Sequence, residues 1–143
     1  MPDELDRIIR DGNRFHDYTR STDNWLHCAD GFTVSVLAGI GAYCTPHWID
    51  AKPGTDPEGP FTHVEVGFPS ERPEPWDQWS EYAETPEEPT DTVYGQVPAR
   101  LVRALVDAHG GVTRAARRSM ALHRWRLAVL SAASSSGSGG DDD

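Results

Sequence analysis

The chain has 143 residues and a formal net charge of -10, and its 37% hydrophobic content includes five tryptophans. A chain of this length forms one domain with one modest core, in which aromatic side chains carry much of the packing. No stretch approaches the ~18 apolar residues of a membrane span, and the charged N-terminus excludes a signal peptide, so we expect a cytosolic protein with no membrane partner and with Cys28 and Cys44 reduced.

The charge is unevenly distributed along the chain. Residues 50–91 hold twelve acidic residues against Lys52 and Arg72, whereas residues 92–140 hold seven arginines against Asp107. The acidic majority raises the electrostatic cost of approaching a phosphate backbone, so a nucleic acid is an unfavourable partner.

The first predicted element is a short amphipathic helix over residues 3–11, which Gly12 ends. Its apolar positions have helical spacing and are Leu5, Ile8 and Ile9. Residues 15–25 show no periodicity and are expected to be irregular.

A strand is predicted next, because hydrophobic and polar residues alternate from Phe32 to Val36. Gly39 and Gly41 interrupt the alternation and predict a hairpin turn or a bulge, where the backbone takes dihedral angles that glycine adopts at low cost. A proline- and glycine-rich loop follows over residues 50–60.

Two further strands are predicted over residues 62–68 and 92–97. In the first of these, Val64, Val66 and Phe68 are expected to share one face. Between the two strands the chain is acidic and rich in proline, and Pro75 can open one short helix that carries tryptophans and a tyrosine on one side.

The last predicted elements are helical. Pro98 opens an amphipathic helix that Gly110 and Gly111 end, with Arg100, Arg103 and Asp107 opposite its apolar face. Thr113 can cap a second helix with a basic face, and residues 132–143 read as a flexible Ser/Gly/Asp tail.

These elements predict an α+β domain over residues 1–131, with its core at about 30–111. Its centre is a small, mostly antiparallel sheet of three to four strands between residues 32 and 97. The helix over 98–109 packs on one face, and the basic C-terminal helix is peripheral.

Three phrases carry a resemblance to a known group of proteins: "DGFTVSVLAGIGAYCTP", "HVEVGFPSERPEPW" and "DTVYGQVPARLVRALVDAHGG". Together they span residues 30–111 and resemble a family of small accessory proteins of actinobacterial tailed phages and prophages. The resemblance implies a phage-type setting, the cytoplasm of the bacterial host, and action on a host component. It carries over no activity, cofactor or site residue.

Cys44 and His47 have the two-residue gap of paired zinc ligands, and Cys28 and His63 would complete a set of four if the strands brought them together. Structural zinc sites usually show two close pairs, and a lone cysteine is commonly a small buried residue. Packing is therefore the favoured role, and neither a metal nor another cofactor is predicted. A zinc-dependent enzyme stays an alternative.

His63 and Glu65 match the His-x-Glu half of a zinc deaminase signature, but no cysteine follows Cys44 to supply the other half. The simpler interpretation places both side chains on the solvent-exposed face of a strand. Nothing in the sequence selects a catalytic residue, so the balance leans away from an enzyme.

The most unusual local composition is a group of aromatic rings among carboxylates: Trp76, Trp79, Tyr82, Glu74, Asp77 and Glu81. Large rings are enriched at binding hot spots, and carboxylates steer a basic partner toward them. We therefore predict a binding protein that neutralises or redirects a host protein through this outward-facing segment. The structural alternative is that the rings cover one edge of the core.

A second alternative is capture of a small signalling nucleotide. The acidic segment repels phosphate, so such capture has to recruit Arg100, Arg103 or the arginines after Thr113, with a homo-oligomer left open.

Overall fold

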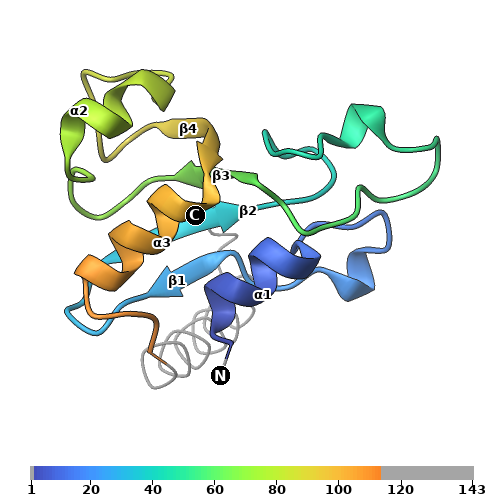
Figure 1. Ribbon diagram of the computed structural model, residues 1–143, viewed down its shortest axis with the longest axis horizontal. Coiled ribbons are helices and arrows are strands. Elements are labelled where there is room, and N and C mark those ends of the chain that lie inside the picture. The colour runs from blue at the N-terminus through green and yellow to red at the C-terminus, as the bar shows by residue number, and fades with distance from the viewer. Residues whose placement is uncertain (1, 114–143) are drawn as a thin grey trace, which may run out of the picture. The chain divides into compact units, whose positions relative to one another are not determined.

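The structure is a computed structural model that describes residues 2–113, and it has an α+β fold (Figure 1). One antiparallel sheet has its strands in chain order: β1 (Trp25–His27), β2 (Thr33–Leu37), β3 (His63–Gly67) and β4 (Val93–Pro98). The helices of these residues are α1 (Glu4–Asp11), α2 (Trp76–Trp79) and α3 (Ala99–Ala108), with 3-10 turns η1 (Tyr18–Arg20), η2 (Trp48–Asp50) and η3 (Ser80–Tyr82). The predicted fold class is confirmed, whereas the basic helix and the tail lie outside the described residues.

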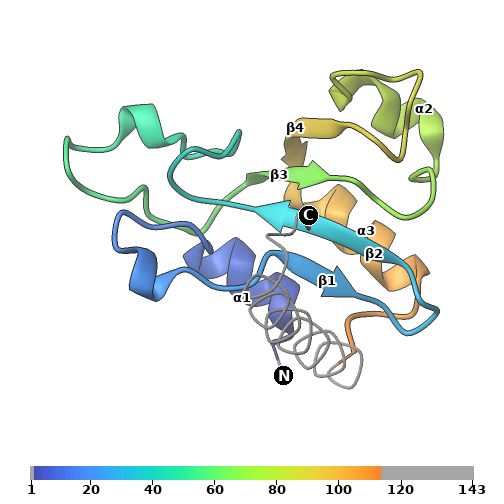
Figure 2. The ribbon, with the colours of Figure 1, turned by 180° about the vertical axis from the view of Figure 1, so that it is seen from behind.

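The core forms between one face of the sheet and the helices. Cross-strand partners such as Val36 and Val66 share this face, and the strand side chains that form the hydrophobic core are Leu26, Val34, Val36, Val64, Val66, Tyr94 and Val97. Helices α1 and α3 pack against it, and from behind the strands lie in front of α3 (Figure 2). The helices contribute Leu5, Ile8, Val102, Leu105 and Val106 to the core.

Helix α1 forms where the sequence predicts it. Asp3 caps the helix by accepting a hydrogen bond from the Asp6 amide at 2.9 Å, and the Asp6 carboxylate accepts one from the Asp3 amide at 3.2 Å. This reciprocal capping satisfies two backbone donors that a helix start leaves free.

Strand β1 was not predicted, because three residues are too few to show a period of two. It forms through its neighbour: Leu26 pairs with Val34, and the Val36 amide donates to the Asn24 carbonyl at 2.8 Å. Asn13 extends the same edge, since its side chain donates to the Val36 carbonyl and accepts from the Ala38 amide.

The glycines after β2 make a turn, as predicted, but no tight hairpin follows. Gly39 and Gly41 both have positive φ, at 128° and 77°. Thr45 forms an antiparallel bridge with His63, the first residue of β3, and the residues between them form a long loop that includes η2.

Phe68 departs from its predicted place beside Val64 and Val66. Its φ is +48°, in the left-handed region, and the side chain is 45% exposed. The Phe68 amide still donates to the Thr92 carbonyl at 3.1 Å, but the left-handed φ breaks the extended conformation after Gly67, so alternation no longer fixes the direction of this side chain.

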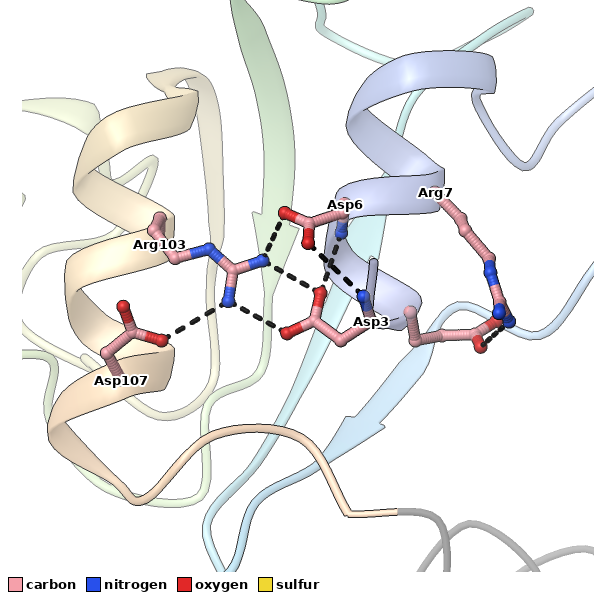
Figure 3. A network of polar contacts seen from close by, with 6 residues as sticks. Asp3, Asp6, Arg7, Arg103 and Asp107 are labelled. Atoms are coloured by element: carbon pink, nitrogen blue, oxygen red, sulfur yellow. Dashed lines mark hydrogen bonds and ion pairs between the residues drawn. The ribbon is translucent and has the colours of Figure 1, made fainter. Parts of the chain in front are cut away.

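Helix α3 begins one residue after Pro98, and Gly110 and Gly111 follow its end with positive φ, as predicted. Arg103 does not project freely into solvent, although the helical pattern predicts this. Its guanidinium lies between the two helices and donates to Asp3 at 2.8 Å, Asp6 at 2.6 Å and Asp107 at 3.2 Å (Figure 3). Its charge therefore holds α1 against α3.

Candidate functional site

The candidate site is the segment between β3 and β4 that contains α2 and η3. We call residues 71–91 the acidic lobe. The lobe holds eight carboxylates and one cation, Arg72. In Figure 1 it is the green and yellow part beside β4.

Tyr94 anchors the lobe to the sheet. Its ring makes edge-to-face contacts with Trp79 at 5.5 Å and with Trp76 at 6.4 Å between centroids. Its hydroxyl donates to the Pro89 carbonyl at 2.5 Å, and burial raises the pKa of this phenol to about 12, so the donor proton is retained at neutral pH.

Backbone hydrogen bonds add to this anchor. Ala83 forms a bridge with Tyr94, and the Glu84 amide donates to the Val93 carbonyl at 3.0 Å. The Thr85 amide donates to the Thr92 hydroxyl at 2.9 Å. The middle of the lobe, residues 83–85, is thus tied to β4 and to Thr92 before it.

The predicted outward-facing row of rings is wrong for Trp79. This side chain is 0% exposed and belongs to the core, and its indole Nε1 has no hydrogen-bond partner. Trp76 and Tyr82 are half-buried and pack against the core from its edge. The structural alternative therefore holds for Trp79 and in part for its two neighbours.

The carboxylates of the lobe are largely unneutralised. Glu74 pairs with Arg72 at 2.8 Å and also accepts from the Trp76 amide. The other seven make no ion pair with a described residue: Glu71, Asp77, Glu81, Glu84, Glu87, Glu88 and Asp91. All seven are exposed, so the lobe presents dense negative charge on its surface.

The four residues that the zinc alternative requires, Cys28, Cys44, His47 and His63, do not gather into a metal site. Within residues 2–113, no three or more His, Cys, Asp or Glu side chains gather as a metal site. Cys44 is buried, and its thiol lies 3.4 Å from the Pro46 carbonyl, to which it donates. Burial raises the pKa of the Cys28 thiol to about 11 and also raises the pKa of the Cys44 thiol, as expected for cysteines in apolar surroundings.

His63 and Glu65 lie on the face of β3 opposite Val64 and Val66. His63 Nδ1 contacts the Thr62 hydroxyl at 2.9 Å, and Glu65 accepts from the Tyr43 amide at 3.0 Å. Each polar side chain has a local partner, and this arrangement gives the Glu65 carboxylate a structural role.

Of the arginines named for the nucleotide alternative, Arg103 is already occupied, Arg100 is exposed on α3, and those after Thr113 lie outside the described residues. Arg103 is bound by three carboxylates, which raise the pKa of its guanidinium, and its side chain is only 29% exposed. Recruiting it to a phosphate would require breaking the contact between α1 and α3.

One exposed surface was missed in the sequence. Trp48 and Ile49 on η2 are 41% and 70% exposed, and Tyr43 nearby in the chain is 55% exposed. The proline- and glycine-rich composition around these residues predicts a loop, but it does not show which apolar side chains of the loop are exposed to solvent.

Comparison of the chain with protein-family models, with curated proteins and with solved structures gave no match. No helix within residues 2–113 has the length and apolar character needed to cross a bilayer.

Proposed function

We propose that the protein is a binding protein whose acidic lobe docks a basic surface of a host-cell protein and thereby neutralises or redirects that protein. The observation that carries the proposal is the set of seven exposed carboxylates that have no cationic partner among the described residues. Concentrated unpaired charge opposes folding through self-repulsion, so its presence on an anchored segment favours a role in association.

The anchor supplies the second requirement of a docking surface. Tyr94 and the buried Trp79 hold the lobe in one conformation, so binding does not have to order a flexible loop. Trp76 is half-buried with the Arg72 guanidinium 5.5 Å from its ring centre, and the part of its ring that stays exposed offers a partner an apolar contact near the charges. Trp79 has no direct contact role in this proposal.

The test is affinity capture of a host protein, followed by measurement of its affinity for purified variants. Asp77→Asn combined with Glu81→Gln removes two lobe charges, and we expect about tenfold weaker binding, mainly through slower association. A steep loss of affinity with added salt should accompany wild-type binding, because exposed charges are screened.

The matched control is Asp50→Asn combined with Glu58→Gln, which removes the same charge from the exposed loop before β3. This control should bind the partner as the wild type does. A lobe variant that binds as tightly as the wild type, or a control that loses as much, would refute the proposal.

A further inference from the structure

A second surface of a different chemical character lies on the segment between α1 and β1, which Figure 1 draws as the blue loop that includes η1. An open depression of about 310 Å³ is lined by residues from this segment and by Leu37 at the end of β2. This volume is at the lower end of the range for small-molecule sites. The lining used below consists of Arg14, Phe15, Tyr18, Asn24 and Leu37.

The glycines of the "AGIGA" stretch place the backbone of Arg14. The Arg14 amide donates to the Ala38 carbonyl at 3.2 Å, and its own carbonyl accepts from the Ile40 amide at 3.3 Å. A Cβ at Gly39 would lie 2.1 Å from the Arg14 carbonyl oxygen, so this approach requires glycine. The fold thus fixes the base of an exposed arginine at the depression.

Arg14 is the cation of this region without a partner. Arg20 pairs with Asp56 at 3.6 Å, and Arg10 pairs with Asp11 at 2.8 Å. Arg14 makes no ion pair and no side-chain hydrogen bond with a described residue. One uncompensated guanidinium matches one anionic group, which it can bind through two parallel hydrogen bonds.

The rest of the lining suits a planar ring. Tyr18 is 82% exposed, and Phe15 is half-buried with the Arg20 guanidinium 4.3 Å above its ring centre. Leu37 adds an apolar side chain. The Asn24 side chain donates to the Ser35 hydroxyl at 2.6 Å, which orients its amide. Stacking on Tyr18 and apolar contact with Leu37 would hold a ring while Arg14 holds the charge.

We propose that this depression binds a small ligand made of a planar ring and one anionic group, either a carboxylate or a phosphate monoester. The site lies on a different segment from the acidic lobe and uses the opposite charge. A failed test of this site therefore does not refute the proposed docking function, and a failed docking test does not refute this site.

Titration calorimetry with two intact probes tests the proposal: adenosine monophosphate for the phosphate and indoleacetate for the carboxylate. We expect at least one of them to bind with a Kd below about 1 mM, and the tighter probe identifies the anion. Adenosine alone and inorganic phosphate alone should each bind at least about tenfold more weakly, because each offers half of the contacts.

Arg14→Gln should raise the Kd of the tighter-binding probe by about 10- to 100-fold, and Tyr18→Ala should also raise this Kd. Arg7→Gln is the control, because Arg7 is an exposed arginine of α1 that does not line the depression. Circular dichroism verifies that each variant is folded. Absence of binding by both probes at about ten times that Kd, unchanged affinity of Arg14→Gln, or an equal loss in Arg7→Gln would overturn the assignment.

Discussion

Arg103 is the residue on which the contact between α1 and α3 depends most. If Arg103→Gln removes the guanidinium, Asp3 and Asp6 remain as neighbouring carboxylates without their cation. We expect the free energy of unfolding to fall by about 1–3 kcal/mol in urea denaturation. Arg100→Gln, on the exposed side of the same helix, should change it by less than about 0.5 kcal/mol. Equal effects of the two substitutions would show that the network adds no stability.

The same network predicts a dependence on acid. The hydrogen bonds from Arg103 lower the pKa of Asp3 below its ordinary value of 3.8. Because the folded-state pKa is the lower one, this stabilisation is fully present above the unfolded-state pKa and is lost as the pH falls through the folded-state pKa. The loss of stability between about pH 5 and about pH 3 should therefore be smaller in Arg103→Gln than in the wild type. Parallel losses in denaturation at the two pH values would contradict this.

At the scale of the element, the short helix α2 is held by Trp79. Trp79→Ala should cost about 3–5 kcal/mol of unfolding free energy, because it empties a large buried volume. Trp48→Ala makes the same chemical change on the exposed η2 turn and should cost less than about 1 kcal/mol. Thermal and urea denaturation compare the two variants, and similar costs would mean that Trp79 does not anchor the lobe.

The turn after β2 allows a second comparison between elements. Gly39 and Gly54 both have positive φ, so replacement of either by alanine strains the backbone. Only at Gly39 would the new Cβ meet another atom, the Arg14 carbonyl oxygen, whereas the space around Gly54 is open. Gly39→Ala should therefore lose about 1–3 kcal/mol more unfolding free energy than Gly54→Ala. Equal losses would mean that the close approach is not required.

At the scale of the whole molecule, strands β2, β3 and β4 and the two longer helices could be predicted from the sequence, because their apolar residues recur with a clear period, whereas the three-residue β1 could not. The burial of Trp79 could not. Trp76 and Trp79 lie three residues apart in the same acidic stretch and both contact the distant Tyr94, yet only Trp79 is fully buried, and no local pattern distinguishes the two.

The role of Arg103 was hidden for the same reason. Its position on α3 indicates solvent, and only the packing of α1 against α3 brings Asp3 and Asp6 to it. That the acidic segment binds another molecule is now a proposal that depends on its exposed carboxylates, whereas the sequence-based prediction depended mainly on its indole rings. For both surfaces proposed for binding, the sequence supplies the charged residues, but only the tertiary contacts show which of these residues lack a partner of opposite charge among the described residues.

The most direct test of the acidic lobe as a docking surface is amide hydrogen exchange, measured on the free protein and on its complex with the captured host protein. The account predicts that new protection is concentrated in residues 71–91 and that residues 43–58, which carry the exposed Trp48 and Ile49, are unchanged. Protection of residues 43–58 with an unchanged lobe would contradict it.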